Sequence, residues 1–180
     1  ILNVDVLSNK LVTDNPVNRC YYCKQGVFGT ILEAAKNDGM TVILDGTNAS
    51  DDADDRPGMK ALQEMKVLSP LRMCGYVKSE IRKQSKEAGL FVYNKPSYAC
   101  LATRIPTGTE IDEEKIKQVE TAETFLFNLG FSDFRVRWMD NKAKIQMPES
   151  QLQALMEKRE VVLEELLKIF DEVLLDLRTR

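Results

Sequence analysis

Histidine is absent from the 180 residues of this sequence. Its absence excludes, within the chain, Ser–His and Cys–His nucleophile pairs and every zinc site that uses imidazole. Long apolar runs are absent as well: no stretch is long enough to cross a bilayer, and none has the character of a secretory signal. Any metal bound by this chain must therefore be held by thiolates, carboxylates or other oxygen ligands.

Cysteine is scarce, and four cysteines in 180 residues are too few for a scaffold built on disulfides. We therefore expect a cytoplasmic protein whose thiols are reduced and available for metal or redox chemistry. The net charge of −3 and the pI near 5.2 argue against a nucleic-acid partner. The first residue is Ile1 rather than Met, which indicates a fragment or a processed product.

The first half of the sequence alternates between strand and helix patterns, which predicts a parallel α/β sheet. One segment, TVILDG, is apolar enough to be a strand buried on both faces. We expect strands at residues 1–7, 41–46 and 67–71, and helices at residues 20–36, 59–65 and 78–90.

The second half has a different order of patterns. It predicts a helix at 112–130, a hairpin split by Asp140 and Asn141, a long helix at 151–170 and a strand at 172–177. This order is typical of an α+β fold. The predicted fold class is therefore α/β, with a parallel-sheet domain at 1–95 and a small α+β domain at 96–180.

Two cysteines lie close together in NRCYYCKQG, residues 18–26. Thiolates at this spacing can bind one metal ion or one cluster iron, but zinc or an iron–sulfur cluster needs further ligands. Alternatively, Cys20 and Cys23 form a redox couple with no third partner. On spacing alone, a thiol pair without a special role or a zinc site is the commoner case.

The remaining thiols are Cys74, in LRMCGYV, and Cys100, in SYACLATRIP. The surroundings of Cys74 are typical of a position in or near the core, whereas those of Cys100 are typical of a loop. Cys20, Cys23 and Cys100 could therefore form a three-thiolate site with one open position. On a [4Fe–4S] cluster, such a site leaves one iron without a protein ligand.

A polar segment, DGTNASDDADDRPG, follows the second expected strand. Gly46, Thr47 and Asn48 would lie just past the carboxyl end of that strand, where α/β folds place ligands. Their side chains and N–H groups suit phosphate or ribose oxygens, although an acidic loop is more often solvated surface. Carboxylates that could hold Mg²⁺ follow at Asp51, Asp52, Asp54 and Asp55.

Two arginines share one face of the strand pattern FRVRW. The guanidiniums of Arg135 and Arg137 could grip a phosphate or a carboxylate, although surface arginines on an amphipathic strand are the commoner case. Glu120 and Glu123, on the preceding helix, are typical of a polar helix face.

Taken together, these segments resemble the LarE family of ATP-dependent sulfur transferases, which are PP-loop ATP pyrophosphatases. The resemblance extends over essentially all of the chain, in the same order and with similar spacing, which is more specific than any single motif. It is carried by NRCYYCK, DGTNASDDADDRPG, LSPL, KSEIRKQSKEAGL, KPSYACLATRIPTG, AETFLFNLGF and FRVR.

The resemblance implies an enzyme that builds the thiocarboxylates of the nickel-pincer cofactor of lactate racemase. ATP would adenylate a carboxylate of pyridinium-3,5-biscarboxylate mononucleotide, and sulfur would then replace AMP. Some family members supply sulfur from their own cysteine, and others use three cysteines to hold a [4Fe–4S] cluster. The three-cysteine pattern of this chain favours the cluster. The resemblance also implies a homo-oligomer assembled through the second domain.

Roles for single residues follow from the same resemblance. Cys100 and Glu123 would be catalytic, Tyr21 would lie by the active site, and Arg135 and Arg137 would bind phosphate. The nucleotide and its Mg²⁺ would lie against Gly46, Thr47, Asn48, Asp51, Asp55 and Arg56.

The sequence also departs from the family pattern. The SGGxDS loop that wraps the ATP pyrophosphate does not occur in it, and the chain corresponds to the last two thirds of such a protein. We therefore expect it to be inactive in adenylation on its own, with an exposed sheet edge. Two alternatives are a related PP-loop enzyme that thiolates tRNA, which the acidic pI disfavours, and a non-catalytic fragment that binds metal or oligomerises.

Overall fold

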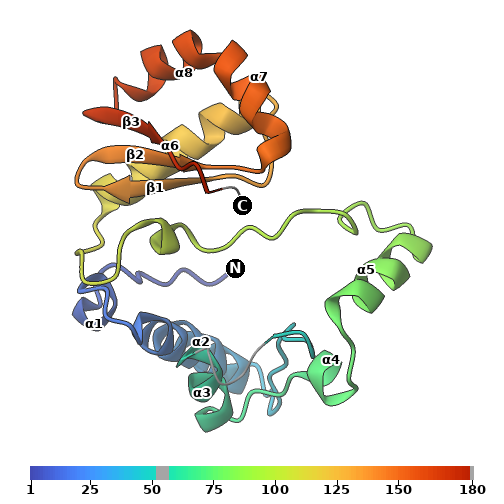
Figure 1. Cartoon of the computed structure of the whole chain (residues 1–180). Coiled ribbons are helices and arrows are strands. Elements are labelled where there is room, and N and C mark those ends of the chain that lie inside the picture. The colour runs from blue at the N-terminus through green and yellow to red at the C-terminus, as the bar shows by residue number, and fades with distance from the viewer. Residues whose placement is uncertain (52–56, 179–180) are drawn as a thin grey trace. The chain divides into compact units, whose positions relative to one another are not determined.

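The chain divides into two compact units, residues 1–95 and residues 96–180. The computed structural model describes residues 1–51 and 57–178. Helices and a small three-stranded sheet make up the two units (Figure 1), which is consistent with the expected α/β class. Among the described helices, none is both long enough and apolar enough to span a membrane.

Helices dominate the first unit. They confirm the three helices expected in this half, at 20–36, 59–65 and 78–90. The longest of these helices ends before Gly39, and the last ends before Gly89. Both glycines have positive φ angles (+74° and +71°), which glycine adopts without strain. The helices are α1 (Lys10–Thr13), α2 (Arg19–Asn37), α3 (Pro57–Glu64), α4 (Pro70–Met73) and α5 (Lys78–Glu87).

Helix α3 packs closely against α2 at Gly58. A Cβ atom at this position would lie 3.0 Å from Cδ of Lys24 and 3.4 Å from the carbonyl oxygen of Cys20. Ala61 and Leu62, on the next turn of α3, are buried. The lack of a side chain at Gly58 thus lets α3 approach the turn of α2 that carries the first two cysteines.

The strands expected in the first unit are largely wrong. Residues 1–7 form no strand. The segments 41–46 and 67–71 pair in parallel, as expected, but only through one bridge between Leu44 and Leu68. Two hydrogen bonds flank that bridge, from Asp45 N to Leu68 O (2.9 Å) and from Leu68 N to Ile43 O (3.0 Å).

The segment 41–46 is not buried on both faces, because a single parallel bridge leaves its apolar side chains without cover. The exposed fractions are 57% for Val42 and 60% for Leu44. The second segment ends soon after the bridge, because Pro70 starts helix α4, a position that proline favours. The first unit therefore exposes apolar surface along the paired segments.

The second unit contains the sheet, whose strand order is β1-β2-β3. Strands β1 and β2 are antiparallel, and β2 and β3 are parallel. Its elements are η1 (Leu101–Arg104), α6 (Glu113–Asn128), β1 (Arg135–Met139), β2 (Lys142–Gln146), η2 (Glu149–Gln151), α7 (Leu152–Glu157), α8 (Arg159–Leu166) and β3 (Glu172–Leu175).

The hairpin predicted around Asp140 and Asn141 is confirmed. Both residues have positive φ angles, 50° and 57°. Two successive left-handed residues make the turn whose twist matches that of the flanking strands, and Asn and Asp tolerate this conformation best after Gly. The helix expected at 151–170 is instead divided, because the chain leaves helical geometry at Lys158.

One face of the sheet forms the core of this unit, and α6, α7 and α8 supply the other side of that core (Figure 1). Val119, Ala122 and Leu126 lie on the apolar face predicted for α6, and all three are fully buried. The side chains of β1 alternate accordingly: Val136 is buried in the core, and its neighbours point to the opposite, polar face.

Candidate functional site

Two of the expected ligand thiols share one turn of α2. Cys20 and Cys23 are three residues apart in the helix, a spacing that places side chains on the same face. Cys20 is exposed and Cys23 is partly buried. Nη2 of Arg19 lies 3.8 Å from Sγ of Cys20. Cys23 also lines a small cavity of about 60 Å³, together with apolar residues that include Val12.

The other two thiols are both exposed. Cys100 directly precedes the short helix η1 in the second unit. Cys74 caps the carboxyl end of α4, so the expected core position is wrong. The reason is that α4 is a single turn at the surface, and Gly75 (φ +75°) reverses the chain directly after it.

The cluster remains a prediction. Within residues 1–51 and 57–178, no three Cys, Asp or Glu side chains come together as a metal site. Cys20 and Cys23 belong to the first unit and Cys100 to the second, so one unit holds two of the three ligands. The chemistry of the donor set fits the group, because all three are cysteines outside any disulfide and at least partly open to solvent.

The loop expected to bind nucleotide begins at the carboxyl end of the bridged segment. Asp45 accepts hydrogen bonds from Oγ of Ser69 (2.6 Å) and from Oγ1 of Thr47 (2.6 Å). Partial burial acts to raise the pKa of Asp45, but these hydrogen bonds outweigh it and hold the pKa below its ordinary value. The carboxylate thus ties the two parallel segments together.

The next residues of the loop fold onto one another. Oδ2 of Asp51 accepts from the backbone N of Asn48 (3.0 Å) and from its Nδ2 (2.9 Å). Arg72 donates to the carbonyl oxygen of Asp51. Gly46 is exposed. Of the other residues proposed here, Asp55 and Arg56 lie outside the described residues, as do Asp52 and Asp54.

Tyr21 belongs to α2, and its side chain reaches the last residue of α3. Its hydroxyl donates to Oε2 of Glu64 (2.6 Å) and accepts from Nε2 of Gln25 (2.8 Å). The hydrogen bond to Glu64, followed by partial desolvation, raises the pKa of Tyr21 above its ordinary value. Tyr21 follows Cys20 in the chain, so the contact also fixes the turn of α2 that carries that thiol.

Glu123 does not lie on a polar helix face, contrary to the expectation for Glu120 and Glu123. It is 1% exposed, whereas Glu120 is exposed. Its carboxylate is bound at two points by Arg104, through Nε to Oε1 (2.7 Å) and Nη2 to Oε2 (3.0 Å). Oε2 also accepts from the hydroxyl of Tyr98 (2.6 Å), and Oε1 accepts from the backbone N of Val136 (2.9 Å).

The two arginines of β1 lie on the polar face of the sheet, as their spacing predicted. Arg135 is nevertheless buried, at 5% exposure, and its Nη2 donates to the carbonyl oxygen of Ser97 (2.7 Å). Arg137 is partly exposed, and its Nε donates to Oε1 of Gln146 (2.8 Å). The explanation of both as ordinary surface arginines is therefore wrong for Arg135.

Sequence reasoning missed two residues of this arrangement, Tyr98 and Arg104. The sequence did contain a signal that Glu123 is buried and needs a cationic partner. Val119, Ala122, Glu123 and Leu126 follow the spacing of one helix face, so Glu123 falls on the core side of α6. A carboxylate on such a face requires a hydrogen-bonding cation. The identity of that cation follows only from the tertiary structure.

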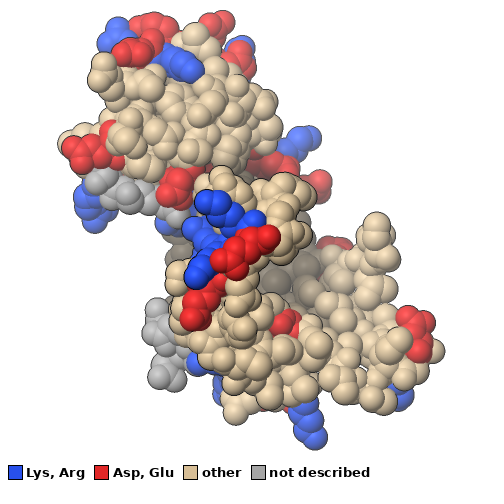
Figure 2. Space-filling view, turned by 90° about the vertical axis from the view of Figure 1, so that its right-hand side faces the viewer, with Lys and Arg blue, Asp and Glu red and all other residues tan. Residues whose placement is uncertain are grey.

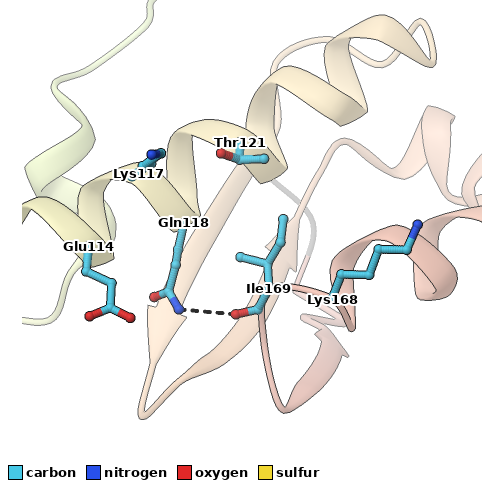
Figure 3. Close-up of a pocket in the computed structure, with 6 residues that line it drawn as sticks. All are labelled: Glu114, Lys117, Gln118, Thr121, Lys168 and Ile169. Atoms are coloured by element: carbon cyan, nitrogen blue, oxygen red, sulfur yellow. Dashed lines mark hydrogen bonds between the residues drawn. The ribbon is translucent and has the colours of Figure 1, made fainter.

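A shallow pocket of about 350 Å³ lies elsewhere on the second unit, between α6 and the loop after α8 (Figure 3). Across it, Nε2 of Gln118 donates to the carbonyl oxygen of Ile169 (3.1 Å). None of the residues expected at the site lines this pocket. Its lining consists of Glu114, Lys117, Gln118, Thr121, Lys168 and Ile169.

Charged side chains of both signs lie close to one another on the face shown in Figure 2. Among the described residues of that face, basic side chains form no broad stripe free of acidic ones. A nucleic-acid backbone is tracked by such a basic stripe. The absence of a nucleic-acid partner stays a prediction from the acidic pI.

No protein-family model matches the chain. Among curated proteins, the chain is 34% identical over 149 residues to the pyridinium-3,5-bisthiocarboxylic acid mononucleotide synthase of Lactiplantibacillus plantarum. That match covers 83% of this chain and 54% of the synthase. It supports the LarE-like family that the motifs indicated.

Two further relatives are uncharacterized proteins. One, from Synechocystis sp., is 37% identical over 170 residues, which is 94% of this chain and 63% of the relative. The other, from Methanocaldococcus jannaschii, is 32% identical over 161 residues, or 89% of this chain and 63% of the relative. The chain thus spans between half and two thirds of the length of these curated relatives.

Proposed function

We propose that this chain is part of an ATP-dependent sulfur transferase that inserts sulfur into pyridinium-3,5-biscarboxylate mononucleotide. The product would serve the nickel-pincer cofactor of lactate racemase. The observation that carries the proposal is the 34% identity to the synthase over 149 residues. Residues 1–95 would be the carboxyl-terminal part of the PP-loop domain, and residues 96–180 a substrate and oligomerisation domain.

The proposed reaction has two steps. A carboxylate oxygen of the substrate attacks the α-phosphorus of ATP, pyrophosphate leaves, and an acyl-adenylate forms. A sulfur nucleophile then attacks the acyl carbon, the bond from that carbon to the AMP oxygen breaks, and AMP departs with the electron pair. Mg²⁺ and basic side chains would offset the charge that develops on the phosphate.

The loop at residues 45–51 would contact the nucleotide. Thr47 and Asn48 would approach the phosphate or ribose oxygens, with the N–H of Gly46 beside them, and Asp51 would help to hold Mg²⁺. The hydrogen bonds of Thr47 to Asp45 and of Asn48 to Asp51 support a loop that is ordered before the ligand arrives. Asp55 and Arg56 would complete this part of the site, and Tyr21 would lie next to it.

The sulfur step would depend on the cysteines. Cys20, Cys23 and Cys100 would hold a [4Fe–4S] cluster, which when bound would carry an additional sulfide for transfer to the substrate. The sharing of one helical turn by Cys20 and Cys23 supports this proposal, as does the exposure of Cys100. Loss of the sulfur atom from Cys100 itself is the alternative donor within the family.

The second unit would bind the substrate mononucleotide. Arg135 and Arg137 would contact its phosphate, and Glu123 would act in catalysis through the groups that it holds. This unit would also join copies of the protein into a homo-oligomer in the cytoplasm. The other partner would be the small nucleotide substrate, with no nucleic acid or membrane involved.

The test of the sulfur site is the iron and acid-labile sulfide content of protein reconstituted without oxygen, together with its visible spectrum. We expect about four irons and four sulfides per chain. Cys100→Ser should abolish them, and the matched variant Cys74→Ser, at another exposed thiol, should keep them. Iron that is absent, or indifferent to Cys100→Ser, would contradict the cluster proposal.

The test of substrate binding is calorimetric titration of the chain with pyridinium-3,5-biscarboxylate mononucleotide. Arg137→Gln should weaken binding by about tenfold or more, because a charge-assisted contact to phosphate is lost. Arg159→Gln is the control, since Arg159 is exposed on α8 and pairs with Glu160. Equal affinities of wild type and Arg137→Gln would argue against the assigned phosphate site.

A further inference from the structure

Arg104, which follows Cys100 in the chain, holds the backbone around Cys100 in place. Nη1 of Arg104 donates to Oγ1 of Thr103 (2.9 Å) and lies within 3.3 Å and 3.5 Å of the carbonyl oxygens of Ala99 and Cys100. The carbonyl oxygen of Cys100 also accepts from the N (2.9 Å) and the Oγ1 (2.7 Å) of Thr103. The backbone at Cys100 is therefore fixed, while its thiol side chain stays exposed.

The two arginines of β1 hold the same segment at its ends. Arg135 donates to the carbonyl oxygen of Ser97 (2.7 Å), and Arg137 donates to that of Thr103. Guanidiniums of three arginines thus bind carbonyl oxygens on both sides of Cys100. Backbone groups in loops are normally satisfied by water, so this arrangement restrains the segment more than an ordinary loop.

Glu123 anchors the central arginine of this set. Its two-point contact leaves Arg104 no freedom to rotate, because the fork of a guanidinium fits a carboxylate in one plane. Both side chains are buried, at 0% and 1% exposure. The fourth hydrogen bond of Glu123, from the backbone N of Val136, ties this anchor to the edge strand β1.

Tyr98 adds a second connection between the anchor and the segment. Its hydroxyl donates to Glu123, and its ring lies 5.1 Å from the guanidinium of Arg104 and 5.6 Å from that of Arg135. The ring also packs against Phe127 of α6, with 5.9 Å between the ring centroids. An aromatic ring flanked by two guanidiniums holds both by cation–π attraction.

We propose that Glu123, Arg104 and Tyr98 are positioning residues for Cys100: together they hold residues 97–104 rigid so that the exposed thiol is presented in one place. This inference rests on the proposed function, in which the Cys100 thiol binds iron or gives up sulfur. Both oxygens of Glu123 are engaged by four donors, so Glu123 acts through the segment that it holds. The position of the Cys100 thiol, as iron ligand or as sulfur donor, therefore does not depend on the closure of a loop.

The experiment is hydrogen exchange followed by mass spectrometry on the 180-residue chain. Glu123→Gln keeps the size of the side chain but removes the charge that orients Arg104. The matched control is Glu120→Gln, the same change on the exposed face of α6. We expect peptides that cover residues 99–105 to exchange at least about tenfold faster in Glu123→Gln and unchanged in Glu120→Gln.

Peptides from β2 and α8 show whether the unit as a whole stays folded. Faster exchange confined to residues 99–105 supports the proposal. Equal exchange in that segment, or a uniform increase over the whole second unit, overturns it for Glu123. Tyr98→Phe, which removes one hydroxyl and keeps the ring, must then give the confined pattern on its own, and its failure to do so ends the proposal.

A spin label supplies a readout that a general loss of stability does not move. A nitroxide is attached to Cys100 in the chain that carries Cys20→Ser, Cys23→Ser and Cys74→Ser. Its spectrum should report greater nanosecond mobility after Glu123→Gln and the same mobility after Glu120→Gln. A label on Cys74, in the chain that keeps only that thiol, should be unaffected by either change.

The outcome is separable from the proposed function. A confined increase in exchange without any iron in the reconstituted protein keeps the positioning role and removes the cluster. Unchanged exchange in a protein that binds a full cluster keeps the cluster and removes the positioning role.

Discussion

Arg104 and Glu123 form an ion pair from which water is excluded. The distance from Nε to Oε1 is 2.7 Å, and the two side chains are 0% and 1% exposed. Replacement of such a pair by apolar residues is often neutral, but removal of one partner leaves a buried charge without compensation. Loss of either side chain alone should therefore destabilise the fold, whatever the pair as a whole contributes to the free energy of unfolding.

Glu123→Ala should lower the free energy of unfolding of the second unit by about 3–5 kcal/mol, because it leaves the guanidinium of Arg104 buried and unpaired. The measurement is urea unfolding followed by the fluorescence of Trp138, the single tryptophan, which lies in β1. The control is Glu120→Ala, which should change stability by less than about 0.5 kcal/mol. A loss below about 1 kcal/mol for Glu123→Ala would mean that water reaches the pair.

Tyr98 should ionise at a higher pH than the ordinary pKa of a tyrosine side chain predicts. Burial, followed by the hydrogen bond to Glu123, raises the pKa of Tyr98 to about 12 from the ordinary 10.0. The folded state thus keeps the phenol proton longer than the unfolded state does. The stability that Tyr98 contributes is fully present below about pH 10 and is lost as the pH rises through about 12.

The check is a phenolate absorbance titration of wild type and Tyr98→Phe. The difference between the two curves should titrate near pH 12, and Glu123→Gln should move that step downward. A difference curve centred near pH 10 would refute the raised pKa.

Asp176 should stabilise the folded chain at pH values above the ordinary pKa of an aspartate, and this contribution should be lost at lower pH. Its Oδ2 accepts from Nζ of Lys144 (2.7 Å) and from Nε2 of Gln146 (2.8 Å). The hydrogen bond from Lys144, followed by that from Gln146, holds the pKa of Asp176 well below its ordinary value of 3.8. The contribution is complete above about pH 3.8 and is lost as the pH falls through the lower folded value.

The measurement compares the urea midpoints of wild type and Asp176→Asn from pH 7 down to pH 2. The gap should be constant down to about pH 4 and should narrow below it. Asp171→Asn, at an exposed position, is the control and should give a small gap throughout. A gap for Asp176→Asn that does not depend on pH would rule out the ionic contribution.

The hairpin turn should discriminate between residues at position 140. Asp140→Val should lower the free energy of unfolding by about 1–2 kcal/mol, because a β-branched residue resists the left-handed conformation. Asp140→Gly, which adopts that conformation without strain, should leave stability within about 0.5 kcal/mol. Thermal unfolding by circular dichroism measures both, and an equal loss in the two variants would show that the carboxylate of Asp140, not its backbone angle, matters.

The apolar spacing of α6 and the turn residues Asp140 and Asn141 were sufficient to predict a helix and a hairpin in the right places. Both signals are local: the helix period and the positive φ angles depend on neighbours in the chain. The segment 41–46 is a counterexample. Its apolar run predicts a buried strand, but burial requires other elements on both faces, and the described chain supplies one parallel bridge.

The sequence by itself determined the helices of the first unit, helix α6 with the hairpin after it, and the resemblance carried by seven collinear segments. Tertiary structure alone decided that Glu123 faces the core, that Arg104 is its partner, and that Arg135 is buried beside Tyr98. Residues 104 and 123 are 19 positions apart, and no periodicity relates them. Their pairing arises because a charge that leaves water must find its counter-charge in space, wherever the chain brings one.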